Sequence, residues 1–195
     1  MPPAKLQRYR AKRDFERTAE PPGSRRRRRR DPIFVIQKHD ASSLHYDFRL
    51  EVSGVLKSWA VPKGPSTDPR DKRLAMEVED HPLDYGDFEG VIAEGNYGAG
   101  AVIVWDTGTY RNLTERDGKE VPLEQALADG HASVWLEGHK LRGGYTLQRV
   151  AGGAKPRWLL IKRRDEHADA RRNPVSTQPE SVLSARTVEQ VAKSA

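Results

Sequence analysis

Short runs of alternating apolar and polar residues fill the middle of this 195-residue chain. In the clearest run, residues 44–52, apolar side chains occupy every second position and polar or charged side chains lie between them. This period of two is typical of a strand that buries one face. Similar runs predict further strands at residues 33–37, 55–61, 74–78, 102–106, 133–137, 145–150 and 158–162.

Helical patterns are scarce by comparison. The one segment that predicts a helix is short, beginning near Pro122 and ending at Gly130. Many short strands separated by Gly, Pro and Asp, without helices between them, favour an antiparallel barrel or sandwich over an α/β fold.

Polar residues are concentrated at the two ends of the chain. Residues 1–32 form a basic arm that includes six consecutive arginines, Arg25 to Arg30, and residues 165–195 are mostly polar and rich in Ala, Ser and Arg. A run of like charges repels itself and stays solvated, although arginines also bind nucleic-acid phosphates. We therefore expect one folded domain, residues 33–164, between a basic N-terminal arm that contributes partly to the site and a polar C-terminal tail.

Composition narrows the functional class. The 34 Lys and Arg residues exceed the 28 Asp and Glu residues, giving a net charge of +6 that favours polyanions such as nucleic acid. Cysteine is absent, so any metal must bind His, Asp or Glu. Because no apolar run approaches the roughly 20 residues of a membrane span and no signal peptide is evident, we expect a soluble protein of the cytoplasm, associated with the nucleoid.

The polar face of the strand at 44–52 carries candidate chemistry. His45, Asp47 and Arg49 project to one side, each about 7 Å from the next. His39 lies just past the preceding strand, and the turn at residues 40–43 can bring it back toward His45. Two imidazoles and a carboxylate suit Mn²⁺, Zn²⁺ or Fe²⁺. The alternative is a face that only meets water, but such a face would more often carry Lys, Glu and Thr.

Further polar groups suit a phosphate ligand. The Arg49 guanidinium offers a fixed fork to a pair of phosphate oxygens. Phosphoryl hydrolysis also needs a Lewis acid, further cations and a proton donor to the leaving oxygen. Candidates for the cations and the proton donor are Lys63, Arg73, His81 and Tyr85, although Lys63 and Arg73 suit a surface position equally well.

Two other features have simpler interpretations. The loop EGNYGAG, Glu94 to Gly100, is similar to a phosphate cradle, but a strand rather than a helix follows it, so we predict a tight turn. Each of the four tryptophans lies in a predicted strand, where core packing is favoured over base stacking: Trp59, Trp105, Trp135 and Trp158.

Three motifs extend this interpretation: FVIQKHDASSLHYDFRLEVSGVLKSWAVPKGPS, EDHPLDYGDFEGVI and EGNYGAG. Together they closely resemble the 3′-phosphoesterase domain of the bacterial DNA ligase D family, from about Asp14 to Arg163. The resemblance implies an all-β fold, a small closed antiparallel β-barrel with one or two short helices, to which we add flexible basic tails. It also implies a metal-dependent enzyme, best with Mn²⁺ (Zn²⁺ or Co²⁺ as alternatives), that trims a 3′-terminal ribonucleoside from a primer-template and then removes the remaining 3′-phosphate.

The resemblance also implies roles for individual residues. It assigns the metal to His39, His45 and Asp47. It assigns the holding or protonation of the phosphate to Arg49, His81 and Tyr85, with support from Lys63 and Arg73. It assigns the ribonuclease step to Arg13, Asp14 and Glu20, joined by Glu79. The expected ligands are 3′ ends of DNA or of DNA/RNA primer-templates, and a separate DNA ligase, polymerase or end-binding repair protein is a candidate partner.

The sequence departs from the multifunctional enzyme in two places. No Lys-x-Asp-Gly motif for nucleotidyl transfer is present, which suggests a stand-alone version of the domain. The arginine run also interrupts the segment between Glu20 and the predicted barrel.

Two other functions fit parts of the pattern. His45 and Asp47 form the His-x-Asp of Fe²⁺ oxygenases, with His139 as the distal histidine and Arg149 as the partner of 2-oxoglutarate, but most of the other polar candidates would then have no role. A non-catalytic nucleic-acid-binding β-barrel is the second alternative.

Overall fold

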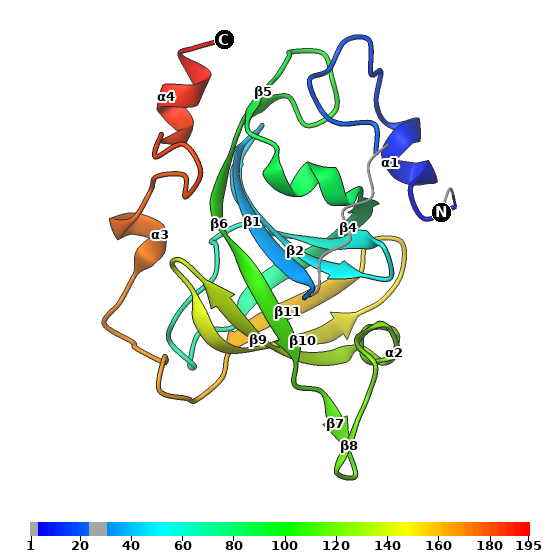
Figure 1. Ribbon diagram of the computed structural model, residues 1–195, viewed down its shortest axis with the longest axis vertical. Coiled ribbons are helices and arrows are strands. Elements are labelled where there is room, and N and C mark those ends of the chain that lie inside the picture. Colours follow the sequence, from blue (N-terminus) through cyan, green and yellow to red (C-terminus); the bar gives the residue numbers. More distant parts are fainter. Residues whose placement is uncertain (1–3, 24–30) are drawn as a thin grey trace.

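The computed structural model describes residues 4–23 and 31–195, and its centre is a closed antiparallel β-barrel (Figure 1). The ring follows the order β1-β2-β3-β4-β11-β10-β9-β6, and β6 pairs with β1 to close it. Its strands are β1 (Ile33–Asp40), β2 (Leu44–Val52), β3 (Val55–Val61), β4 (Arg73–His81), β6 (Gly100–Asn112), β9 (His131–Gly138), β10 (Arg142–Ala151) and β11 (Arg157–Lys162). The all-β barrel predicted from the sequence is confirmed.

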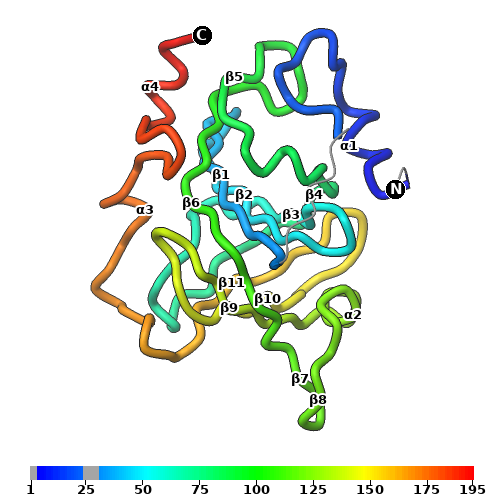
Figure 2. Tube along the Cα trace, in the orientation of Figure 1, coloured from blue at the N-terminus to red at the C-terminus, as the bar shows by residue number. Residues whose placement is uncertain are grey.

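The remaining elements are short. Strand β5 (Gly90–Ile92) extends the sheet beside β6, and β7 (Glu115–Arg116) with β8 (Lys119–Glu120) forms a small hairpin that projects from the barrel (Figures 1 and 2). The helices are α1 (Gln7–Ala11), the 3-10 helix η1 (Leu83–Asp87), α2 (Leu123–Asp129), α3 (Pro174–Thr177) and α4 (Val188–Ala192). The predicted helix is α2, which ends at Gly130 in the left-handed conformation (φ 87°) that glycine adopts readily. Among the described residues, no helix has the length and apolarity needed to cross a membrane.

The barrel interior holds the larger of the cores. Alternation along β2 directs Tyr46, Phe48 and Leu50 inward, where they form one cluster with side chains from the other barrel strands. Trp59, Trp105 and Trp158 are fully buried in this cluster, so the predicted core role is confirmed for these three. Trp135 is only partly buried, and its indole N–H donates to Glu137.

A second core lies outside the barrel wall, on the opposite face of β1. Val35 and Val104 on the barrel strands pack there against Tyr85 of η1 and Tyr9 of α1. Tyr9 is completely buried and its hydroxyl donates to the backbone carbonyl of Pro21 at 2.7 Å. The outer face of β1 and β2 is therefore covered by η1 and by the N-terminal segment. The polar residues of that face lie between the sheet and these two segments.

The described parts of both terminal segments lie against the barrel (Figure 1). In the C-terminal segment, Val188 and Val191 of α4 pack on Ala101 and Ile103 of β6, and Lys140 anchors the backbone of residues 178–180. This packing differs from the flexible tails that we expected. The physical reason is that a few apolar side chains in each polar segment are buried against the barrel. The arginine run falls within residues 24–30, outside the described residues.

Candidate active site

A cavity of about 310 Å³ lies on the outer face of the sheet, beneath η1 and the N-terminal segment. Its walls come from β1 to β4, from η1, from the N-terminal segment and from the loop before β6. It is lined by many of the residues that the sequence singled out: Arg13, Glu20, His39, His45, Asp47, Arg49, Glu79, His81 and Tyr85. The fold thus brings together side chains from two distant parts of the chain.

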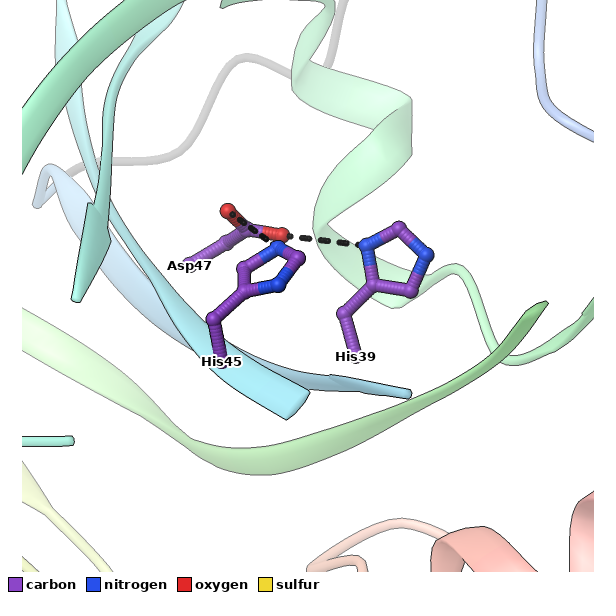
Figure 3. A group of neighbouring side chains, drawn as sticks. All are labelled: His39, His45 and Asp47. Carbon is purple, nitrogen blue, oxygen red and sulfur yellow. Dashed lines mark ion pairs between the residues drawn. The ribbon is translucent and has the colours of Figure 1, made fainter. Parts of the chain in front are cut away.

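His39, His45 and Asp47, which all line this cavity, form one group of neighbouring side chains (Figure 3). Their ligand atoms all lie within 4.8 Å of one another. His39 Nδ1 is 3.6 Å from one Asp47 carboxylate oxygen, and His45 Nε2 is 3.4 Å from the other. The group therefore has the ligand set and spacing of a divalent metal site.

The sequence placed His39 beyond the end of its strand, but it lies within β1. The strand runs to Asp40, and the register pairs His39 directly with His45 across the hairpin. Cross-strand pairing, rather than a turn that swings back, brings the two imidazoles together with ring centroids 4.8 Å apart.

The second nitrogen of each imidazole has its own acceptor. His39 Nε2 donates to the backbone carbonyl of Gly98 at 2.7 Å, and His45 Nδ1 donates to that of Ser43 at 3.0 Å. In the neutral form of each imidazole, these hydrogen bonds leave His39 Nδ1 and His45 Nε2 as lone pairs facing Asp47, and in the protonated form the same two nitrogens donate to Asp47. Such outer partners orient metal-binding histidines, so the three residues fit a metal without rearrangement.

The Asp47 carboxylate carries the negative charge that suits a cation. Burial raises the pKa of Asp47, but the Arg49 guanidinium and the hydrogen bonds from the two imidazoles outweigh this effect and hold that pKa well below its ordinary range. Asp47 is therefore an anion at neutral pH. Burial lowers the pKa of His45, but its hydrogen bond to Asp47 and the carboxylate charge outweigh burial, so that pKa is raised.

Arg49 is held by neighbours on every side. Its Nε donates to Gln37 Oε1 at 2.7 Å, its Nη1 donates to Ser58 Oγ at 2.8 Å, and its Nη2 lies 3.3 Å from Asp47. Gln37 also donates to the backbone carbonyl of Tyr85 at 2.9 Å, which ties Arg49 to η1. The guanidinium is thus fixed beside the metal group, with Nη2 next to Asp47 in the cavity lining.

Sequence reasoning missed Gln37 and Ser58. A signal was present for Gln37, because it interrupts an apolar strand two residues before His39 and therefore faces the same side. Ser58 carried no such signal, since its partner lies on the neighbouring strand.

His81 presents one ring nitrogen to the cavity. Its Nδ1 is 2.9 Å from the backbone carbonyl of Glu79, to which it donates, and its Nε2 faces Arg13 Nη2 at 3.4 Å. Burial, together with the positive charges of Arg49 and Arg13, lowers the pKa of His81 well below its ordinary value. The imidazole is therefore neutral at pH 7, with Nε2 as an acceptor.

Replacing His81 with asparagine should flatten the acid dependence of stability. The pKa of the unfolded histidine is about 6.5, and the folded pKa is lower. As pH falls below 6.5 the unfolded chain gains a proton that the folded chain excludes, so folding should weaken by up to about 1.4 kcal/mol per pH unit. Urea unfolding of both proteins in EDTA, from pH 6.5 to pH 5, measures the two slopes.

The groups that face His81 do not titrate in that window. They are the Arg13 and Arg49 guanidiniums, the rings of Tyr9 and Tyr85, and the Asp47 carboxylate, whose pKa is held well below its ordinary range. His45 has a raised pKa and acts with the opposite sign above pH 6.5. Equal slopes for wild type and His81→Asn between pH 5 and 6.5 would show that the imidazole is not held neutral.

The N-terminal segment closes the cavity with paired charges. Arg13 Nε binds Glu20 Oε1 at 2.9 Å and Arg13 Nη1 lies 3.3 Å from Glu79. Glu20 also accepts the Tyr85 hydroxyl at 2.9 Å. Burial and the Glu20 charge raise the pKa of Tyr85 well above its ordinary value, so this phenol stays protonated. Lys12, which we did not predict, binds Glu79 at 3.0 Å.

Three predicted site residues do not line the cavity. Asp14 is exposed, and its carboxylate accepts the backbone N–H of Glu16. Lys63 is exposed just beyond the end of β3, and Arg73 at the start of β4 lies 3.6 Å from Asp71. Lys63 and Arg73 flank the end of the β3–β4 pairing that is nearest to Asp47.

The residues required for an oxygenase do not meet at this site. His139 is exposed after β9, where its backbone N–H donates to Asp106. Arg149 donates to the backbone carbonyl of Ala128 and lies over the Trp158 ring. Neither residue lines the cavity that contains His45 and Asp47.

Comparisons with known proteins relate this chain to a family of phosphoesterase domains. Residues 37–149 match the family model described as the DNA ligase D 3′-phosphoesterase domain. The chain is 50% identical, over 96% of its length, to the multifunctional non-homologous end joining protein LigD of Pseudomonas aeruginosa, and 42% identical, over 83%, to the multifunctional non-homologous end joining DNA repair protein LigD of Mycobacterium tuberculosis. It spans 22% and 20% of the length of these two relatives. The chain belongs to the family of DNA ligase D 3′-phosphoesterase domains.

Proposed function

We propose that this protein is a metal-dependent 3′-end-healing phosphoesterase of DNA repair by non-homologous end joining. It removes a 3′-terminal ribonucleoside and then the 3′-phosphate from primer-template ends, and it leaves a 3′-hydroxyl. The observation that carries the proposal is the shared cavity, in which a His-His-Asp group lies beside a fixed arginine and a neutral histidine. The names of the two relatives, which refer to end joining and DNA repair, support the cellular role.

The metal would be held by His39 Nδ1, His45 Nε2 and an Asp47 oxygen. Mn²⁺ is the proposed ion, with Zn²⁺ or Co²⁺ as alternatives. When bound, the metal would polarise a phosphoryl oxygen and lower the pKa of a bound water.

The surrounding side chains have separate tasks in this proposal. Arg49 Nη2 donates to a phosphate oxygen and stabilises charge that develops there. The Tyr85 phenol, which remains protonated, would turn its one hydroxyl proton from Glu20 toward the leaving oxygen. His81 Nε2, the acceptor nitrogen of a neutral imidazole, would accept a hydrogen bond from a protonated phosphate oxygen and so help to hold the phosphate.

The ribonuclease step would add the N-terminal segment. Arg13, Glu20 and Glu79 form its charged network on the cavity wall and would contact the terminal ribose. Asp14 would take part only if the substrate extends over the exposed surface of this segment. Lys63 and Arg73 would attract the nucleic-acid backbone from the rim.

Release of inorganic phosphate from a 3′-phosphate primer-template tests the proposal. Wild type should release phosphate with Mn²⁺ and lose this activity in EDTA, and His139→Ala, whose histidine lies outside the cavity, should retain it. A second primer that ends in one ribonucleotide tests the ribonuclease step. Binding of both primers without any metal-dependent turnover would instead favour a non-catalytic nucleic-acid-binding barrel.

The proposed product also indicates a class of protein partner. The product, a 3′-hydroxyl end, is the substrate that a polymerase or a ligase requires. A DNA ligase, a polymerase or an end-binding repair protein is therefore the proposed partner class. The proposed location is the cytoplasm, at the nucleoid.

A further inference from the structure

Tyr97 is an exposed aromatic ring in the wall of the cavity. It belongs to the loop between β5 and β6 and keeps 49% of its surface exposed. Among the described residues, the other large apolar side chains with comparable exposure do not line this cavity. The other tyrosine in the cavity wall, Tyr85, is buried. A half-exposed ring in a charged cavity wall suggests that its partner is the substrate.

The ring is held in place by two cations. Lys12 Nζ lies 4.5 Å from the ring centroid and 3.3 Å from the hydroxyl, and the Arg13 guanidinium lies 5.5 Å from the centroid. Both cations are also bound to Glu79. A base that stacks on this ring would therefore meet a surface that is already oriented, which reduces the entropy cost of binding.

The loop places the ring next to the metal group. Gly98, the residue after Tyr97, accepts the hydrogen bond from His39 Nε2 at 2.7 Å. On the other side, Asn96 donates to the backbone carbonyls of Arg17 and Ala93. Gly98 has φ 73°, and a Cβ there would lie 3.3 Å from the His39 ring. A phosphate bound at the metal group would thus have its attached nucleoside within the part of the cavity that Tyr97 borders.

We propose that Tyr97 is the stacking platform for the nucleobase of the 3′-terminal nucleotide. The inference rests on the proposed function and adds how the end is gripped. Stacking accepts every base because every base has a π-face, which suits an enzyme that must treat ends of any sequence. Ends that carry a base should therefore bind better than ends with an abasic terminal residue.

Binding measurements in EDTA test this without hydrolysis. The probes are two fluorescein-labelled primer-templates with a 3′-phosphate, one with a terminal base and one with an abasic terminal residue. By fluorescence anisotropy, wild type should bind the base-bearing end about 5-fold or more tightly than the abasic end. Tyr97→Ala should reduce this ratio to about 1 by weakening only the base-bearing complex. Tyr97→Phe should preserve the ratio, as should the exposed Leu183→Ala outside the cavity.

Two results would overturn the inference. One is a wild-type ratio already near 1, and the other is an equal loss of affinity for both ends in Tyr97→Ala, which would mean that the ring only supports Lys12 and the loop. Phosphate release with Mn²⁺, measured in parallel, separates this question from the proposed function. Base discrimination without turnover would contradict only the proposed function, whereas turnover without discrimination would contradict only the role of Tyr97.

Discussion

Replacing His39, His45 or Asp47 with alanine should reduce metal-dependent phosphate release by more than about 100-fold, because loss of even an outer-shell partner of a metal ligand typically costs 10- to 100-fold. The three ligand atoms lie within 4.8 Å of one another, so removal of one leaves an incomplete set. Both proposed steps should be lost together, since they share the metal. Initial rates on the 3′-phosphate and ribonucleotide primers, at saturating Mn²⁺, measure the effect.

Mn²⁺ binding followed by electron paramagnetic resonance gives an independent measurement on the same variants. Asp47→Asn is the matched change at that position, because it keeps the shape of the side chain beside Arg49. His139→Ala is the matched histidine control and should bind Mn²⁺ as wild type does. Rates near those of wild type from any one of the three alanine variants would remove that residue from the ligand set.

The second large effect is expected at Arg49. Arg49→Lys keeps the charge but loses the planar fork, so it cannot donate to Gln37, Ser58 and a phosphate oxygen at once. Phosphate release should fall by about 100- to 1,000-fold, the usual effect of removing one donor from a charge-stabilising site. The free energy of unfolding should also fall by about 1–3 kcal/mol, because a buried acceptor loses its donor.

Steady-state rates and urea unfolding measure the two effects separately. Arg111→Lys is the matched control, since Arg111 is exposed on β6 and contacts the Trp135 ring outside the cavity. Gln37→Ala should show a similar loss of stability with a smaller loss of rate, because the guanidinium stays but is less firmly held. Normal turnover by Arg49→Lys would mean that this residue supports the cavity wall and does not contact the phosphate.

Alternation alone predicted much of the barrel. The strand at 44–52 has the predicted bounds, because each polar residue in it is followed by an apolar residue that the interior requires. Strands β1, β4 and β6 run beyond their predicted ends, since backbone pairing continues where the apolar pattern stops. The short β5, β7 and β8 were not predicted, because two or three residues carry no detectable period.

In the candidate site, residues on a single strand were predictable, whereas their partners on other strands were not. His45, Asp47 and Arg49 were predictable as one polar face because spacing along a single strand determines the face on which a side chain lies. The partners that hold Arg49, namely Gln37 and Ser58, come from neighbouring strands. Sequence spacing says nothing about register between strands.

The sequence by itself determined the barrel strands, the helix at residues 123–129 and the chemical face of β2, since each depends on a local period or on a turn residue. Only the tertiary structure decided that His39 pairs directly with His45, and that the N-terminal segment covers the site through Tyr9 and Arg13. It also decided that Asp14, Lys63 and Arg73 lie outside the cavity lining. The physical reason is that these relations depend on strand register and on the packing of segments far apart in the chain, which no local pattern of residues encodes.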